Sequence, residues 1–295
     1  MFETSSRSSP CTASRQNKRL CRNKSVRDIL QKARFHATTE CQEQFRYDRW
    51  NCSAEHKNIS FFDGSKVYRE TALLYAMSAA ALTHVIAREC AEGSRRLCRC
   101  AGHPSPEDTV RNWRWGISDD NYSFGRRFTR RFAQLRYRRV DHLHGYLVRH
   151  NMVVGIQAVG QMQTVCKCHG VSGSCTTKTC WKRLKPFKET VEILKGSYHK
   201  AQLKVYKNRA SRQGSSKGQM SRNTLVYTDS SPDFCPTTRG RRCLDSDNCG
   251  VLCCSRGYIS RSVEETEHCD CHWVSKHYKL SCRRCTFMKE IYACK

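Results

Sequence analysis

The chain has 295 residues, enough for two domains, and only 38% of them are hydrophobic, so one large apolar core is not expected. Lysine and arginine number 53 against 26 acidic residues, which gives a formal net charge of +27. This charge favours polyanionic partners, namely nucleic acid, heparan-type glycans or anionic lipid surfaces, and it does not choose among them.

The 21 cysteines are clustered, and ten of them lie between Cys235 and Cys294. That last segment is too small and polar to be held together by burial alone, so it is expected to be a disulfide-stapled module. Disulfides imply passage through an oxidising compartment. The first residues, MFETSSRSSPC, contain no apolar stretch typical of a signal peptide, so we expect that a leader is missing from this sequence.

The first long element expected is a helix over 71–87, the most apolar run of the chain. The run falls short of the roughly 20 residues that cross a bilayer, and it contains Ser78, Thr83 and His84. A buried core helix is therefore the favoured interpretation.

Residues 124–139 predict an amphipathic helix. Phe124, Phe128, Phe132 and Leu135 recur at helical spacing, and seven arginines occupy the other positions. The aromatic stripe is expected to pack inward, which leaves the arginine face available to a polyanion. The helical pattern continues through 140–165.

Residues 195–223 are rich in Lys, Arg, Ser, Gly and Gln, as is typical of an exposed linker. From Cys235 onward, alternating residues with Gly and Pro predict short strands and loops.

The stretch CKCHGVSGSC (166–175) surrounds Ser172 with cysteines and glycines. Zinc is one interpretation, but structural zinc sites usually repeat a CxxC pair, and the spacing here does not. A hydrolase elbow is another, but Ser174 replaces the last glycine of G-x-S-x-G, and the dense cysteines leave no room for the flanking strand and helix.

A disulfide-framed display loop is the third interpretation. Pairing Cys168 with Cys175 and Cys166 with Cys180 would nest two loops around Ser172, although four cysteines allow three connectivities. Gly170 and Gly173 permit the tight backbone that such a loop needs.

With these motifs in view, the chain resembles the Wnt family of secreted signalling proteins. The signature CKCHGVSGSC is followed by KTCW (178–181), and further matches run along almost the whole chain: ECQEQFR (40–46), RWNC (49–52), RETA (69–72), LVY (225–227), SPDFC (231–235) and LCCSRG (252–257). The segments YAMSAAALTH (75–84) and WKRLKPFKET (181–190) are most similar to the ninth Wnt subclass.

The resemblance implies an α+β fold in two parts. A mainly helical N-terminal domain (11–194) would carry a disulfide-framed, lipid-bearing thumb loop (166–180). A basic linker (195–231) would lead to a small cysteine-rich β/loop C-terminal domain (232–295) with a finger hairpin (269–285).

The resemblance also implies a ligand and not an enzyme. A membrane-bound O-acyltransferase would esterify Ser172 with a monounsaturated fatty acid, of the palmitoleoyl type. The acyl chain and the finger residues Trp273, Val274 and Tyr278 would grip the cysteine-rich domain of a Frizzled receptor.

The resemblance further implies that the partners include a lipoprotein-receptor-related co-receptor, a Wnt carrier protein and heparan sulfate proteoglycans. It implies neither a nucleic-acid partner nor a bound metal. The protein would act in development, in the extracellular space and matrix. Asn51, in Asn-Cys-Ser, matches a family glycosylation site.

By the same resemblance nine disulfides are expected: Cys41–Cys52, Cys90–Cys98, Cys166–Cys180, Cys168–Cys175, Cys235–Cys254, Cys243–Cys249, Cys253–Cys294, Cys269–Cys285 and Cys271–Cys282. Cys11–Cys21 is a tenth candidate.

The sequence departs from the family pattern in two places. Ser118 stands where the family has the partner of Cys100, so Cys100 is left odd. The expected finger tip, Trp273 to Tyr278, lacks the usual adjacent cysteines.

A zinc-stabilised, intracellular nucleic-acid-binding protein is the alternative from another class. It accommodates the charge and the missing leader, but it does not explain the cysteine spacing or the long motif matches. A thiol count on denatured protein separates the two: about one free thiol fits the disulfide protein, and nearly all free thiols with bound zinc fit the alternative.

Overall fold

The computed structural model describes residues 11, 15–53, 55–56, 59–60, 66–92, 98, 120–136, 142–204, 223–274 and 279–295. The chain divides into two compact units. Unit 1 comprises Met1–Gln44 and Cys52–Ser231, and unit 2 comprises Phe45–Asn51 and Pro232–Lys295. Cys100 and Ser118 lie outside the described residues.

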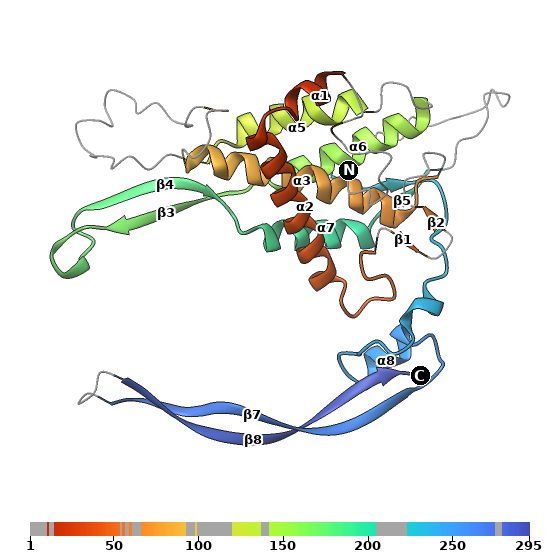
Figure 1. Ribbon diagram of the computed structural model, residues 1–295, viewed down its shortest axis with the longest axis vertical. Coiled ribbons are helices and arrows are strands. Elements are labelled where there is room, and N and C mark those ends of the chain that lie inside the picture. Colours follow the sequence, from red (N-terminus) through yellow and green to blue (C-terminus); the bar gives the residue numbers. More distant parts are fainter. Residues whose placement is uncertain are drawn as a thin grey trace. The chain divides into compact units, whose positions relative to one another are not determined.

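Unit 1 is a helical bundle with short strands at its margins (Figure 1). Its helices are α1 (Arg15–Leu20), α2 (Lys24–Gln44), α3 (Arg69–Ala91), α5 (Tyr122–Arg136), α6 (His142–Ala158) and α7 (Phe187–His199). Its strands are β1 (Glu55–His56), β2 (Ile59–Ser60), β3 (Met162–Cys168), β4 (Lys178–Leu184), β5 (Gln202–Leu203) and β6 (Val226–Tyr227).

Helix α3 is the core of unit 1, and α2, α5, α6 and α7 all pack against it. Most of its residues are buried, including the charged residues Glu70 and Glu89. Its apolar composition and length would suit a membrane span, but 94% of its most apolar window is buried inside the protein. Many of its side chains are alanine or serine, which lets neighbouring helices approach closely.

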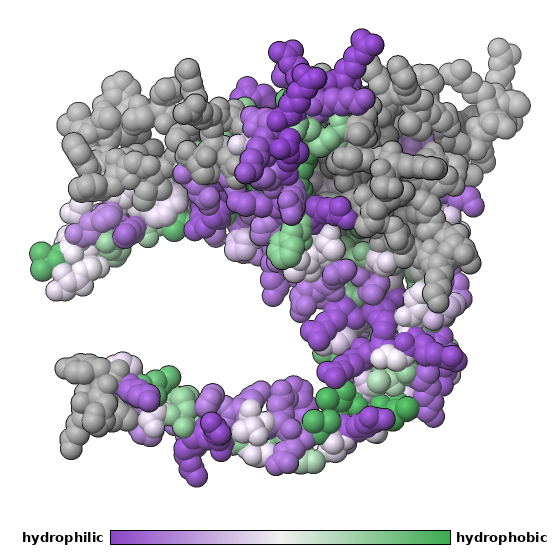
Figure 2. All heavy atoms as spheres, viewed as in Figure 1, coloured by the Kyte–Doolittle hydropathy of each residue, from purple (hydrophilic) through white to green (hydrophobic). Residues whose placement is uncertain are grey.

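The approach is closest at Gly155 of α6. A Cβ atom at this position would lie 1.9 Å from the carbonyl oxygen of Ala76 in α3, so only glycine fits without a shift of the backbone. Where Figure 2 colours the face of the bundle that it shows, most of the side chains are hydrophilic.

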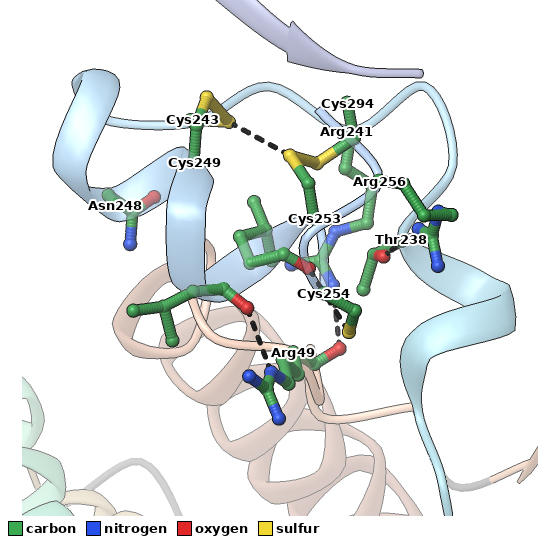
Figure 3. Close-up of a disulfide and its surroundings, with 12 residues drawn as sticks. Arg49, Thr238, Arg241, Cys243, Asn248, Cys249, Cys253, Cys254, Arg256 and Cys294 are labelled. Carbon is green, nitrogen blue, oxygen red and sulfur yellow. Dashed lines mark hydrogen bonds between the residues drawn. A yellow bond between two sulfur atoms is a disulfide. The ribbon is translucent and has the colours of Figure 1, made fainter. Parts of the chain in front are cut away.

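Unit 2 contains a short 3-10 turn (Cys235–Thr238), helix α8 (Ser246–Leu252) and a long antiparallel ribbon of β7 (Tyr258–Val274) and β8 (Lys279–Cys294). Its described core is small: Leu252 packs with Cys243, Cys249, Cys253 and Cys294. The sulfurs of Cys243 and Cys253, from two neighbouring disulfides, are 3.7 Å apart (Figure 3).

The segment Phe45–Asn51 completes unit 2, although it follows α2 in the chain. Phe45 and Trp50 are buried and meet edge to face, and Trp50 also lies against Phe234. Arg241 donates hydrogen bonds of 2.8 Å to the carbonyl oxygens of Arg46, Asp48 and Arg49.

Two further bonds join this segment to the rest of unit 2. The guanidinium of Arg49 donates to the carbonyl oxygen of Val251 (Figure 3), and the side-chain amide of Asn248 donates to the carbonyl oxygen of Tyr47. The Cys41–Cys52 disulfide joins the residues that flank the segment on either side.

The expected α+β fold class is confirmed: unit 1 is mainly helical, and unit 2 is a small disulfide-rich β unit. The domain limits differ from the sequence-based expectation in two respects. The segment Phe45–Asn51 belongs to unit 2, and the described ends of the expected linker, 195–204 and 223–231, cluster with unit 1. Helix α7 continues to His199, and β5 pairs in parallel with β6. In the sequence these two strands stand before and after residues 205–222, which lie outside the described part.

Candidate functional site: the thumb loop

The thumb is the antiparallel ribbon of β3 and β4, connected by residues 169–177. Cys166 lies directly opposite Cys180 in the strand register, and the two form a disulfide. A second disulfide joins Cys168 to Cys175 inside the first. A crosslink that closes a loop of 14 residues stabilises the folded ribbon by roughly 3 kcal/mol, mainly by restricting the unfolded chain.

The tip is a single 3-10 turn, Val171–Gly173, with Ser172 at its centre. Ser172 has φ 55° and ψ 26°, in the left-handed region that costs a residue with a Cβ atom about 1–2 kcal/mol. The neighbouring Val171 is 89% exposed, and Ser172 is exposed as well. The Ser172 hydroxyl has no hydrogen-bond partner among the residues that the structure describes.

The backbone around Ser172 is fixed by its own hydrogen bonds. The Gly170 amide donates to the Ser174 carbonyl oxygen at 2.8 Å, and the Gly173 amide donates back to the Gly170 carbonyl oxygen at 2.9 Å. A Cβ atom at Gly170 would lie 2.1 Å from the Ser174 hydroxyl oxygen and 2.6 Å from its carbonyl oxygen. The tip therefore holds one free hydroxyl outward on a braced turn.

The base of the thumb is attached to the helical bundle through Asp120. Its carboxylate accepts a hydrogen bond of 2.7 Å from the Leu184 amide, and its own amide donates to the Lys182 carbonyl oxygen at 3.0 Å. Asp120 is 5% exposed, and burial raises the pKa of this carboxyl above its ordinary value.

His84 of α3 makes the second attachment. Its Nε2 lies 3.0 Å from the Lys185 carbonyl oxygen, and because a carbonyl only accepts, Nε2 carries the proton. Burial lowers the pKa of His84 to about 4, so the imidazole is neutral at physiological pH. The ring also packs against Phe187, where α7 begins.

Neither attachment was predicted from the sequence. His84 is a polar residue within the apolar helical run 71–87, and this position could have indicated a buried hydrogen bond. In the sequence analysis it served only as an argument that the run does not span a membrane. Asp120 stands in a stretch with no pattern of its own, and only the fold brings it to Leu184.

A cavity of about 440 Å³ lies beside this base, lined in part by His84, Val85 and Phe187. Its charged lining residues include the pairs Lys32–Glu89 and Arg88–Glu92. The charged part of the cavity lining is therefore of mixed sign.

The ribbon of β7 and β8 includes the expected finger (269–285) and extends well beyond it. Trp273 is 59% exposed and lies opposite Leu280, which is 55% exposed. Val274 ends β7, and Tyr278 lies outside the described residues. A register shift between Cys269 and His272 places Asp270 at a positive φ of 47°.

The described residues form ten disulfides, which comprise the nine expected pairs and Cys11–Cys21. Within the part of the chain that the structure describes, two clusters have potential ligand atoms close enough together to hold a metal ion: the sulfurs of Cys243, Cys253 and Cys294, and the sulfurs of Cys269 and Cys285 with the carboxylate of Asp270. Every cysteine in both clusters belongs to a disulfide, so none offers the thiolate that zinc binds. Asn51 is exposed.

The comparisons with known proteins agree with this geometry. The sequence model of the Wnt family matches residues 9–295. The chain is 42% identical to Protein Wnt-4 of Drosophila melanogaster, with 97% of this chain and 56% of that protein covered. It is 40% identical to Protein Wnt-9b of Homo sapiens, and the match covers 96% of this chain and 83% of that protein. It is 36% identical to Protein Wnt-9a of Gallus gallus, and the match covers 95% of this chain and 84% of that protein.

Solved structures give the same result. A chain of the structure of human WLS in complex with WNT8A aligns with a TM-score of 0.64 and 28% identity, covering 92% of this chain and 94% of that one. The N-terminal domain and linker of Drosophila WntD aligns with a TM-score of 0.52 and 22% identity, covering 71% and 98%, which shows the fold alone. Members of the family are secreted signalling ligands and not enzymes, and the similarity to the Wnt-9 proteins agrees with the expected subclass. The protein described here belongs to the Wnt family.

Proposed function

We propose that this chain is a secreted, lipid-modified Wnt ligand whose Ser172 carries a monounsaturated fatty acyl ester. The observation that supports the proposal best is the thumb tip. Ser172 is exposed, its hydroxyl has no partner among the described residues, and two nested disulfides hold its backbone. A membrane-bound O-acyltransferase would therefore meet a nucleophilic hydroxyl presented on a rigid turn.

The acyl chain supplies the binding energy in this proposal. Burial of each CH₂ group contributes about 0.8 kcal/mol, so a dozen buried groups contribute roughly 10 kcal/mol before ordering costs. A thumb that is already ordered loses little further entropy when the chain docks. The receptor is the cysteine-rich domain of a Frizzled protein, and the finger, with Trp273 exposed near its tip, makes a second contact.

Other partners follow from the family and the charge. A lipoprotein-receptor-related co-receptor completes the receptor complex, and heparan sulfate proteoglycans retain the ligand in the extracellular matrix through its net charge of +27. A carrier of the WLS type transports the acylated protein, in line with the similarity to the WLS–WNT8A structure. Asn51 is the proposed glycosylation site.

Intact-mass analysis of protein secreted by cultured cells, together with binding to a Frizzled cysteine-rich domain, tests the proposal. Ser172→Ala is expected to remove the acyl mass increment and to weaken receptor binding at least 100-fold. Ser174→Ala is the matched control, because its hydroxyl is two residues away and already pairs with Thr176 at 3.1 Å. If Ser172→Ala keeps both the mass increment and the affinity, the proposed mechanism is wrong.

A further inference from the structure

The first part of β7, residues 258–268, has a free edge, which we call the β7 edge. Among the residues that the structure describes, β7 pairs with β8 alone, and no other strand lies on its outer side. The base of β8 differs, because Arg242 forms a bridge with Ala293 on the side away from β7. Figure 1 draws β7 and β8 as a long ribbon that leads away from α8. The β7 edge therefore presents unpaired backbone donors and acceptors along its length.

Free edges of this length are usually protected in natural proteins, by lysine, proline, a bulge or early termination. The β7 edge contains neither lysine nor proline. Its register with β8 is regular up to Cys269, and the shift in register comes only between Cys269 and His272. The strand β8, by contrast, carries four cations: Lys279, Arg283, Arg284 and Lys289. The β7 edge is thus the unprotected side of the ribbon and is suited to pairing with a further strand.

One face of the ribbon beside this edge is partly apolar. Ile259 and Val263 share that face, because side chains two or four residues apart along a strand point the same way. Phe287 joins them, since it stands opposite Glu265 in the register. Ile259 is 46% exposed, Val263 42% and Phe287 52%. A two-stranded ribbon buries neither of its faces and is marginally stable by itself, so further strands would stabilise it.

The charges of the β7 edge restrict what can pair with it. In a chain with a net charge of +27, this edge carries Glu264, Glu265 and Glu267 against the single cation Arg261. Glu265 pairs with Lys289 of β8 at 2.7 Å. Within the described part of the chain, Arg261, Glu264 and Glu267 form no ion pair. A matching strand must therefore place a carboxylate opposite Arg261 and avoid placing carboxylates opposite the three glutamates.

A second copy of the same strand meets both conditions. In an antiparallel pair with Val263 opposite Val263 of the second copy, Arg261 stands opposite Glu265, and the two-fold symmetry repeats this pair. Arg261 also lies diagonally across from Glu267, within reach of a long side chain. Glu264 stands opposite Ser262, and Glu267 stands opposite an isoleucine. No two like charges are therefore opposed in this register.

The neighbouring symmetric registers are worse. Centring the pair on Glu264 places two carboxylates directly opposite each other, which is destabilising. Centring it on Ser262 leaves Arg261 opposite Val263 and removes both ion pairs. The charge pattern of the β7 edge thus selects one register, and this is the register that brings the two Val263 side chains together on one face.

We propose that the β7 edge is the contact of a two-fold homodimer, in which two ribbons join into a four-stranded antiparallel sheet centred on Val263. Because the same edge is used by both chains, the contact closes on itself and stops at two copies. The partly apolar faces of the two ribbons become one continuous face. The inference goes beyond the proposed function and does not depend on the acyl group of Ser172.

A charge-swap experiment tests the proposal. The molar mass of the secreted protein is measured by sedimentation equilibrium in a nonionic detergent, which keeps acyl chains from causing association. The wild type is expected to dimerise. Arg261→Glu and Glu265→Arg alone should each raise the dimer dissociation constant roughly 10-fold, because each opposes like charges at two symmetric places. The double variant restores opposite charges and should return to within about threefold of the wild type.

The matched control is Arg284→Glu, which makes the same change of charge at an exposed residue of β8. It should change the dissociation constant by less than about threefold. A wild type that stays monomeric at its highest soluble concentration would overturn the proposal. So would a double variant that associates no better than the single variants. Larger assemblies that Arg284→Glu weakens would also overturn it, by showing that β7 pairs head to tail with β8 of the next copy.

Two further measurements keep the result interpretable. Glu265→Arg also removes the pair with Lys289, so its thermal unfolding is compared with that of the wild type. Where that variant fails to fold, Arg261→Gln takes its place, with an expected dissociation constant between those of the wild type and Arg261→Glu. An unchanged constant for Arg261→Gln and Arg261→Glu would remove Arg261 from the contact and overturn the proposal. Acyl mass, measured on the same samples, is expected to be unchanged, so failure of dimerisation leaves the proposed function untouched.

Discussion

The guanidinium of Arg241 donates a hydrogen bond of 2.8 Å to the carbonyl oxygen of Arg49, 192 residues earlier in the chain. Two more bonds from the same side chain reach the carbonyl oxygens of Arg46 and Asp48. One arginine thus satisfies three acceptors of the segment Phe45–Asn51, which has no helix or strand to satisfy them. Burial lowers the pKa of Arg241 from its ordinary high value, and a guanidinium stays charged even so.

Arg241→Ala is therefore expected to destabilise unit 2. Hydrogen bonds from a charged donor contribute about 1.5–3 kcal/mol where they are shielded, and two of these three are exposed, so we expect a total loss of about 2–3 kcal/mol. Arg242→Ala is the control, because that neighbouring side chain is exposed. Thermal unfolding and limited proteolysis between Phe45 and Asn51 measure the effect. Equal behaviour of the two variants would show that the three bonds contribute nothing.

The sequence predicted the parts of the fold that depend on local pattern. The apolar run 71–87 indicated α3, and the phenylalanine spacing at 124–132 indicated α5 and the outward face of its arginines. These predictions succeed because helical periodicity is a property of neighbouring residues. The motif matches supplied both the thumb and the finger, whereas cysteine spacing alone had left the nested thumb disulfides as one of three connectivities.

Contacts between distant residues could not be predicted in this way. Nothing in RYDRW (46–50) indicates that the segment packs with residues of the C-terminal unit. Likewise, Asp120 and His84 are single polar residues, and their bonds to Leu184 and Lys185 exist only because the bundle brings the base of the thumb to them. Such contacts depend on the full three-dimensional arrangement, which a single sequence does not display.

Gly170→Ala is expected to disturb the thumb tip and to reduce acylation of Ser172. The new Cβ atom would lie 2.6 Å from the backbone carbonyl oxygen of Ser174, so the turn itself must shift. Gly173→Ala is the graded control. Its Cβ atom would meet no atom within 4 Å, and only the positive φ of 77° would cost about 1 kcal/mol. The acylated fraction by intact mass should fall further for Gly170→Ala than for Gly173→Ala, and the reverse order would contradict the role assigned to the tip.

Gly196→Ala is expected to stabilise unit 1. Gly196 lies inside α7, it is exposed, and a Cβ atom there would contact nothing within 4 Å. Replacing glycine by alanine in a helix interior gains about 0.5–1 kcal/mol. Chemical denaturation should show a higher midpoint with an unchanged slope, while a lower midpoint would mean that the position needs the glycine.

Trp273→Ala is expected to weaken binding to the Frizzled cysteine-rich domain at least 10-fold, mostly through faster dissociation. An exposed tryptophan near the end of a ribbon is the type of side chain that dominates protein interfaces. Met288→Ala is the control, since Met288 is 69% exposed on the ribbon and lies far from the tip in sequence. Surface-immobilised receptor domain and acylated ligand give both rates. Similar dissociation rates for the two variants would remove Trp273 from the interface.

Acidification is expected to destabilise unit 1 through His84. The pKa of this imidazole is about 4 in the folded protein and near 6.5 in the unfolded chain, so between these values the unfolded state binds more protons. The stability that the neutral ring provides is therefore complete above pH 6.5 and is lost as the pH falls toward 4, by about 2 kcal/mol given the partial exposure of the ring.

Asp120 acts in the opposite sense, because its pKa is raised on folding and the protonated form is favoured in the native state. The informative quantity is therefore the difference between the wild type and His84→Gln, whose amide keeps a donor for the Lys185 carbonyl oxygen but does not titrate. Unfolding free energies measured from pH 7 to pH 4.5 should converge as the pH falls. Parallel curves across this range would show that His84 is not the group responsible.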